Sequence, residues 1–430
     1  MPEEPAIPPW ITHAQTDRVP PLLPTARPSA LGRQVLAILL SLCLALFLAD
    51  AVVSLVDDSL ILFFGLHWLA PIRGVVFLLA ILLALVVYGG MGFTPMIPKR
   101  LFLPITLFSP LAALAAIPFV IFCYSRIQQV AWTISLCQFL LGLCILRRVQ
   151  GGFKFRWPPV AARLLEGRRF SWLNLGAFVF VNVLVLPPAA IVYLWFCTTV
   201  AVDHFSEGFV ALRPGGLTMQ VRTYVRNDGK AIELIPMSHV GESAFYQMVA
   251  ESFQTNATVM LEGVTDDRGL LTNKITYQRM ASSLGLTEQA EEFQPSRGEL
   301  VHADVDIEVF GTNTIGFLNL IMLVHAKGMS PETVLKLMQY TPPPQFEQQL
   351  LKDLLQKRNR HLLGEIQARL PESERILVPW GAAHMPELAR EIQKTGFRLD
   401  QTREYTVIRF GSAGNKREGI SHLKNHGKSQ

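Results

Sequence analysis

The sequence predicts an N-terminal multi-span α-helical membrane region followed by an α/β, or mixed α+β, domain. Hydrophobic residues make up 50% of the 430 residues and charged residues only 17%, whereas a soluble globular protein has about 25% charged residues. The apolar residues are concentrated before residue 202, in runs that approach the roughly 20 residues a helix needs to cross a bilayer. After residue 202, short strand-like runs alternate with segments of helical spacing, which is typical of helices packed on a sheet.

Four regions follow from this pattern. Residues 1–33 are rich in proline and lack the apolar core of a signal peptide, so we expect them to be disordered and the first apolar run to be retained. Residues 34–201 form the membrane region and residues 202–410 the folded domain. Residues 411–430 are polar and basic, and we expect a disordered tail.

Five apolar runs are candidate transmembrane helices: residues 35–56, 75–91, 101–124, 130–146 and 173–200. The last contains Pro187 and Pro188 near its centre, which favours a kink. Asp50 is the only charged residue clearly within a span, and we interpret it as part of a solvated helix end. Asp57 and Asp58 follow that span. With so little charge inside the spans, the region is predicted to anchor the chain and not to transport a solute.

The basic residues favour one orientation in the membrane. Residues 1–201 carry a net charge of +7 and residues 202–430 a net charge of −2. With five spans and a cytoplasmic N-terminus, every strongly basic loop lies on the cytoplasmic side, as the positive-inside rule requires. We therefore expect an integral protein of a bacterial inner membrane with a periplasmic or extracellular C-terminal domain. The positive charge flanks the spans, so no nucleic-acid partner is expected.

The C-terminal domain begins with a predicted β-hairpin. Residues 217–226 and 230–237 alternate apolar and polar side chains on either side of Asn227-Asp-Gly229, a strong signal for a tight turn. The remaining predicted strands are 257–261, 300–307, 376–379 and 404–410. The predicted helices are 242–254, 271–284, 314–326, 331–339, 346–370 and 386–394.

Two histidines lie just past the ends of predicted strands. His239 follows the second hairpin strand, and His384 follows the strand 376–379 after the small residues Gly381-Ala-Ala. Because ligands bind outside the carboxyl ends of strands in open α/β sheets, the two histidines are predicted to share one composite site. No cysteine occurs after Cys197, so that site has no thiolate ligand.

The predicted helix 346–370 has an apolar stripe that is interrupted by Arg358, with Asn359 beside it. An arginine on a core-facing stripe must be paired, because an unpaired buried charge is prohibitively costly. Either Arg358 and Asn359 point into a polar pocket and contact an anion or the reacting group, or Arg358 extends along the helix edge to solvent.

Three carboxylates are further candidates. Glu242 lies one helical turn after the first histidine, where it could bind the same metal, orient the imidazole or simply stabilise a helix N-terminus. Glu262 ends a predicted buried strand, where an unpartnered carboxylate is unusual. Asp304 alternates with His302 and Asp306 along a predicted strand, so the three form either a set of metal ligands or a solvated face.

Four short motifs resemble, in their order, those of the TraB/Tiki family, which includes the GumN and pheromone-shutdown proteins. They are Ser238-His-Val240, Leu261-Glu-Gly-Val264, Lys357-Arg-Asn359 and Gly381-Ala-Ala-His-Met-Pro386. The resemblance covers about residues 215–410 and not the membrane region. Some members are described as divalent-metal-dependent proteases, and others are assigned no activity.

The resemblance implies a defined set of site residues. The core is His239, Glu262, Arg358 and His384, with Asn359 in support and Asp304 as a further member. The chain departs from the family at Pro236, which stands where the first histidine motif has glycine. Proline fixes φ and removes a hydrogen-bond donor, so the turn before His239 is expected to differ.

Two functions are consistent with these residues. The first is a membrane-anchored, metal-dependent hydrolase, a peptidase acting on a peptide or protein substrate, in which Glu262, Arg358 and Asn359 are catalytic. The metal ligands are then His239, His384, Glu242 and Asp304; such nitrogen and oxygen donors suit Mn²⁺, Co²⁺ or Zn²⁺ without selecting among them. The second is a non-catalytic module, tethered to the lipid bilayer, that binds a peptide or signal molecule; the altered first motif favours it.

Overall fold

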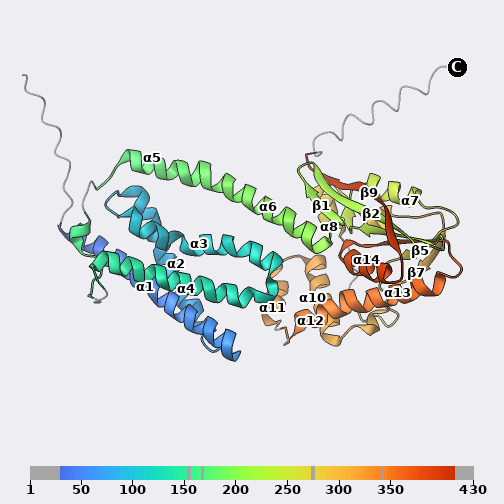
Figure 1. The fold of residues 1–430 in the computed structure, drawn as a ribbon, viewed down its shortest axis with the longest axis horizontal. Coiled ribbons are helices and arrows are strands. Elements are labelled where there is room, and N and C mark those ends of the chain that lie inside the picture. The colour runs from blue at the N-terminus through green and yellow to red at the C-terminus, as the bar shows by residue number, and fades with distance from the viewer. Residues whose placement is uncertain are drawn as a thin grey trace, which may run out of the picture. The chain divides into compact units, whose positions relative to one another are not determined.

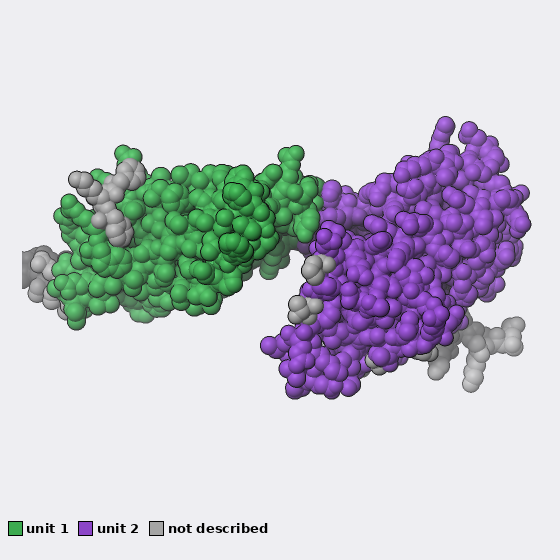
Figure 2. All heavy atoms as spheres, turned by 90° about the horizontal axis from the view of Figure 1, so that it is seen from below, with its two compact units in different colours: residues 1–194 green, residues 195–430 purple. Residues whose placement is uncertain are grey.

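The computed structural model describes residues 30–152, 156–165, 169–272, 277–340, 342–343 and 345–411. The chain divides into two compact units, residues 1–194 and residues 195–430, which Figure 2 colours separately. The division falls inside a helix, a few residues before the predicted boundary at 201. The expected disorder concerns residues 1–33 and 411–430, most of which lie outside the described residues.

The first unit contains helices long and apolar enough to cross a membrane, and the described residues include five such helices, as predicted. They are α1 (Ala30–Phe64), α2 (Ala70–Phe93), α3 (Lys99–Phe122), η1 with α4 (Tyr124–Arg126 and Ile127–Gln150), and α5, η3 and α6 in succession (Trp172–Phe180, Val181–Val185 and Leu186–Ser206). A short turn, η2 (Ala162–Leu164), precedes the fifth. The π-helical segment η3 ends just before Pro187 and Pro188, where two backbone donors are missing.

The first helix is longer than predicted, and this changes the environment of its acidic residues. Helix α1 continues to Phe64, so Asp57 and Asp58 lie within the helix and not in a following loop. Asp50 is 2% exposed, and its carboxylate accepts a hydrogen bond from Gln138 of α4. The interpretation of Asp50 as part of a solvated helix end is therefore wrong, because α4 packs against this face of α1 and supplies polar side chains to it.

The second unit is built on a mixed seven-stranded sheet. The strand order is β1-β2-β3-β8-β5-β7, and β9 pairs with β2. The four strands β3, β8, β5 and β7 are parallel to one another, whereas β1, β2 and β9 run antiparallel to their neighbours. The strands are β1 (Val210–Arg213), β2 (Gly216–Val225), β3 (Ala231–Met237), β5 (Thr258–Leu261), β7 (Glu299–His302), β8 (Arg375–Gly381) and β9 (Arg398–Arg409).

The predicted hairpin is confirmed as β2 and β3. Tyr224 pairs with Ile232 and Val225 with Ala231. Gly229 closes the turn with φ +86°, a conformation that side chains disfavour, which explains the glycine of the Asn-Asp-Gly sequence.

Helices cover both faces of this sheet (Figure 1). One face packs its strand residues, among them Leu234 and Val378, against Leu362 of α13 and Leu388 of α14. The other face packs against α7 through Phe245 and its neighbours. The helices are α7 (Ser243–Glu251), α8 (Gln278–Leu284), α9 (Gln289–Glu292), α10 (Thr312–Lys327), α11 (Pro331–Gln339), α12 (Phe346–Leu351), α13 (Arg358–Arg369) and α14 (Met385–Lys394). Short elements complete the unit: η4 (Ile307–Val309), η5 (Lys352–Lys357), η6 (Ala382–His384), β4 (Val240–Gly241) and β6 (Thr287–Glu288).

Four predicted elements differ from the structure. The strand predicted at 404–410 begins six residues earlier, at Arg398, and ends at Arg409. The helix predicted at 271–284 is observed only from Gln278, and residues 273–276 lie outside the described residues. The strand predicted at 300–307 ends at His302, because Asp304 and Asp306 accept hydrogen bonds from the backbone N–H groups of Val305 and Glu308 and so favour a turn. The helix predicted at 346–370 forms as a continuous run, α12, η5 and α13, with a π-helical segment in its middle.

The buried indole of Trp380 gives a test of this sheet. Its side chain is 0% exposed, and its Nε1–H donates to the Met260 carbonyl, 3.0 Å away, which ties β8 to β5. We expect Trp380→Phe to lose this hydrogen bond and part of the core volume, costing about 2 kcal/mol. Hydrogen exchange of β5 and β8 amides in the full chain measures the change. The exposed Trp172→Phe is the control, and equal protection in both variants would contradict the assigned role of the indole.

Candidate functional site

Three neighbouring parallel strands bring polar residues to one edge of the sheet. Glu262 follows β5 directly, Asp304 follows β7 by two residues, and His384 ends the turn η6 that follows β8. His239 follows the fourth parallel strand, β3. The carboxyl ends of parallel strands meet at the same edge, and ligands in such sheets bind there. Because β3 and β8 are parallel neighbours, both histidines lie at the same edge of the sheet, as predicted.

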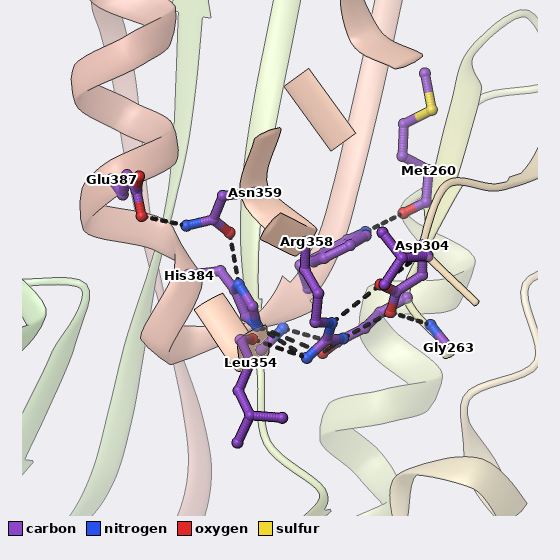
Figure 3. Close-up of polar contacts among 12 residues, drawn as sticks. Met260, Gly263, Asp304, Leu354, Arg358, Asn359, His384 and Glu387 are labelled. Carbon is purple, nitrogen blue, oxygen red and sulfur yellow. Dashed lines mark hydrogen bonds and ion pairs between the residues drawn. The ribbon is translucent and has the colours of Figure 1, made fainter. Parts of the chain in front are cut away.

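Arg358, the first residue of α13, lies between Asp304, His384 and Glu262 (Figure 3). Its Nη2 donates to Glu262 Oε1 at 2.7 Å and to Asp304 Oδ2 at 2.6 Å, and its Nε donates to Asp304 Oδ1 at 3.0 Å. The bond pair to Asp304 is a planar, bidentate match between guanidinium and carboxylate. The Arg358 side chain is 12% exposed, and that of Asp304 is 0% exposed. Of the two alternatives that the sequence left open, the structure shows the first: Arg358 is paired and points into a polar pocket.

Burial and pairing act on the Arg358 pKa in opposite directions. Desolvation lowers it, but the hydrogen bonds and charges of Asp304 and Glu262 outweigh that effect and raise the pKa above its ordinary value. The guanidinium is therefore a fixed positive charge. Two carboxylates around one guanidinium leave the cluster with one surplus negative charge.

A chain of hydrogen bonds fixes the proton on His384. Asn359 Nδ2 donates to Glu387 Oε2 at 2.6 Å, so the Asn359 Oδ1 atom faces His384 Nδ1, also at 2.6 Å. An amide oxygen can only accept, so Nδ1 carries the proton. Nε2 is then unprotonated, and it accepts a hydrogen bond from Arg358 Nη1 at 3.2 Å. Asn359 is 1% exposed, and its role is to hold the imidazole in this tautomer.

The neutral state of His384 has two physical causes. Burial disfavours the imidazolium, and the neighbouring Arg358 charge repels it; together they lower the His384 pKa from 6.5 to about 4. The ring lies edge-on to the indole of Trp380, with 5.3 Å between ring centroids and 88° between planes. The same indole lies 5.3 Å from the guanidinium carbon of Arg358. Trp380 is thus an apolar support beneath both groups.

The site opens into a cleft of about 1070 Å³ in the second unit. Glu262, Arg358 and His384 line it together with His239, which is exposed and stacks on Tyr277 at 4.8 Å with ring planes 3° apart. Apolar side chains form most of the remaining wall: Leu261, Val264, Leu271, Phe293, Leu300, Ile307, Phe310, Leu318, Leu354 and Leu355. A few polar groups at one place in an apolar cleft are typical of a small-molecule or peptide site.

The remaining candidates do not belong to the Arg358 cluster. Glu242 precedes α7, accepts a hydrogen bond from the Arg409 backbone at 2.8 Å, and does not line the cleft. Asp306 accepts hydrogen bonds from Thr265 and from the Asp267 backbone and closes a turn. His302 lines the cleft, but it does not share a strand face with the two aspartates, because β7 ends there.

The donor types match a divalent metal, but their arrangement does not. Glu262 Oε1, both Asp304 carboxylate oxygens and His384 Nε2 all accept hydrogen bonds from Arg358, so the guanidinium occupies the place between them. Over the described parts of the chain, no three histidine, cysteine or carboxylate side chains gather around a common point that could hold a metal. The residues as they lie fit an arginine-centred cluster and do not fit a resident metal ion.

Comparisons with known proteins add no relative. No family model, no curated protein and no solved structure matches the chain. The resemblance to the TraB/Tiki family thus rests on the four sequence motifs alone.

Sequence reasoning missed Glu387, Trp380 and Tyr277. Glu387 lies one helical turn after His384, a spacing that could have indicated a shared face. Trp380 directly precedes the Gly-Ala-Ala-His motif, but a tryptophan in a strand is ordinarily a core residue. No local pattern connects Tyr277 with His239, because their stacking depends on the tertiary fold.

The lowered pKa of His384 predicts a pH dependence of stability. The unfolded chain, with an ordinary histidine pKa of 6.5, binds the proton more readily than the folded protein, in which the pKa is about 4. The folded state should therefore lose on the order of 3 kcal/mol as pH falls from about 6.5 to about 4. Thermal unfolding of the full chain across this range should show a shallower pH dependence for His384→Gln. The cleft-wall variant His302→Gln should keep the wild-type dependence; equal slopes in all three proteins would contradict a buried neutral His384.

Proposed function

We propose that the chain is a membrane-anchored hydrolase that cleaves peptides in the cleft of its second unit. The observation that carries the proposal is a fixed guanidinium that shares one cluster with a carboxylate and a neutral imidazole at the wall of an apolar cleft. These are the groups that hydrolysis of an uncharged acyl bond needs: a proton acceptor and a charge that stabilises the developing oxyanion. The motif resemblance points to the same class of reaction.

Each group has a distinct role in this proposal. Arg358 donates to the substrate carbonyl oxygen through the Nη1 hydrogen that, in the structure, makes only a long 3.5 Å contact with the Leu354 carbonyl, and it stabilises the negative charge that forms there. Glu262, which lines the cleft 3.9 Å from His384 Nε2, accepts the proton of the attacking water. His384 Nε2 takes that proton from Glu262, becomes an imidazolium only in this step, and gives the proton to the leaving amine, which returns the ring to its neutral form; Asn359 and Glu387 keep the ring in place. Asp304 is buried and holds Arg358 at the correct angle.

The cleft suggests the substrate class. Its apolar walls suit the side chains of an extended peptide segment, and the exposed ring of His239, stacked on the half-buried Tyr277, offers a flat surface for a planar group such as a peptide bond. Because the cluster does not fit a metal as folded, no step of the proposed reaction involves one.

We further propose that the protein resides in a bacterial inner membrane with the cleft on the periplasmic or extracellular side. The five apolar helices support a membrane location. The concentration of basic residues in alternate loops supports a cytoplasmic N-terminus. The second unit is then accessible to extracytoplasmic peptides, while the helices hold it at the bilayer.

Substitutions in the cluster test the catalytic proposal. We expect His384→Ala and Glu262→Gln to lower kcat by about 10²- to 10³-fold with little change in KM, because each removes a group used in the transition state. The assay uses the full chain in detergent with a library of internally quenched fluorescent peptides, and His302→Ala, on the same cleft wall, is the matched control.

Two outcomes of that assay would contradict the proposal. Unchanged turnover in His384→Ala would remove the mechanism. Turnover that a chelator abolishes and Mn²⁺, Co²⁺ or Zn²⁺ restores would show that a metal replaces Arg358 between the ligands. Binding of a library peptide without any cleavage would instead support the second function, a tethered peptide-binding module.

The orientation is tested by labelling single cysteines in intact cells. In a background with all five native cysteines changed to serine, we expect Ser296→Cys, on the exposed surface of the second unit, to react with a membrane-impermeant maleimide. Arg100→Cys, in the basic first turn of α3, should react only after permeabilisation. The reverse pattern would place the cleft in the cytoplasm.

A further inference from the structure

In the first unit, which we now call the membrane unit, a row of buried polar residues lies along α1; we call this row the α1 stripe. It consists of Asp50, Ser54, Asp57 and Asp58, each 5% exposed or less. Spacings of three and four residues place them on one face of the helix. This face packs against α4, whose Ser135 and Gln138 are also buried and donate to carboxylates of the stripe.

One carboxylate of the stripe is fully satisfied. Asp58 accepts hydrogen bonds from Arg73 Nη1 at 2.7 Å, Ser135 Oγ at 2.6 Å and Gln128 Nε2 at 3.3 Å. All three partners are donors, and one is a cation. Asp58 is thus a buried carboxylate that is paired with the partly exposed Arg73 and hydrogen-bonded on both oxygens.

The other two carboxylates are each left half-satisfied. Asp50 Oδ2 accepts from Gln138 at 2.8 Å, and Asp57 Oδ2 accepts from Arg73 at 3.0 Å. Oδ1 of each is buried and has no hydrogen-bond partner among the residues that the structure describes. A buried polar atom without a partner is rare and costly, so each of these atoms indicates a binding partner other than the protein.

Charge identifies the partner. Arg73 can balance only one of the three carboxylates, and a buried carboxylate without a counter-charge is prohibitively costly in a membrane protein. A metal cation would need six or more oxygen ligands. Among the described residues, Arg73 is the one charged group that is bonded to the aspartates of the stripe. The other bonded partners are the neutral Gln128, Ser135 and Gln138. These residues offer too few oxygen atoms to bind a metal ion, so the cation that can neutralise the remaining carboxylates is a proton.

We propose that Asp50 and Asp57 are proton-binding sites that exchange with solvent at the Arg73 end of the stripe. Each carboxylate takes one proton from water on Oδ1 and becomes a neutral carboxylic acid, and release reverses the step. Arg73 has a side chain that is 32% exposed, so the stripe reaches the surface of the bundle there. Asp50 lies about 10 Å further along the helix axis, with Ser54 between the two acids. The membrane unit thus binds protons in addition to anchoring the chain.

Infrared difference spectroscopy of the full chain in lipid nanodiscs tests this proposal. We expect two carboxylic-acid carbonyl bands that change with pH and shift in D₂O. Asp50→Asn and Asp57→Asn should each remove one band and still fold, since asparagine mimics the neutral acid. Gln138→Leu keeps the acid but removes its hydrogen bond, and should move the Asp50 band to higher frequency; it decides the assignment if an asparagine variant does not fold.

Asp58→Asn is the matched control, because Asp58 is paired and ionised and its loss should remove no carboxylic-acid band. The proposal is overturned by a wild-type spectrum without such bands. It is equally overturned by bands that respond to neither pH nor D₂O, since those protons would not exchange. Loss of a band in Asp58→Asn would contradict the assignment of the proton to Asp50 and Asp57.

Discussion

The geometry of the second unit depends on the ion pairs that neutralise the buried guanidinium of Arg358. A charge at this depth is tolerated only beside opposite charge, and Glu262 and Asp304 come from two different strands to provide it. The Asp304 side chain is fully buried, so its charge would be costly in this place without the arginine. The helix α13 and the strands β5 and β7 are therefore locked together at the edge where His384 also lies. This same constraint, and not the apolar core alone, specifies the geometry of the site.

Much of this arrangement was accessible from the sequence. The hairpin, the order of strands and helices, and the placement of His239 and His384 after strands follow from local patterns. So does the paired state of Arg358, because its position on an apolar stripe required a partner. The identity of that partner did not follow, since Glu262 and Asp304 are 96 and 54 residues away. Asp304 was assigned to a strand face because polar residues alternate there in the sequence. Such alternation cannot reveal that Asp304 accepts a hydrogen bond from the Val305 backbone N–H and so ends the strand.

The membrane unit shows the converse limit. Hydropathy located all five helices, because length and apolarity decide whether a segment can span a bilayer. It could not indicate which polar residues face a neighbouring helix. Asp50 was interpreted as part of a solvated helix end, and Asp57 and Asp58 were placed after the span, because acidic residues near a span end ordinarily contact water, whereas all three are buried. Hydropathy averages over a helix, and the polar stripe is a property of one face.

The strand order has a consequence for how the chain acquires its site. Strand β8 lies in the middle of the sheet, between β3 and β5, yet it is the last but one in sequence. Until residues 375–381 are synthesised, the parallel half of the sheet has no centre, and β5 with β7 has no partner on that side. The five apolar helices, which lie within residues 30–206, are synthesised long before β8. They are thus made before the cleft can form, and the edges of β3 and β5 that β8 covers stay unpaired until then, the period in which exposed strand edges are most prone to aggregate.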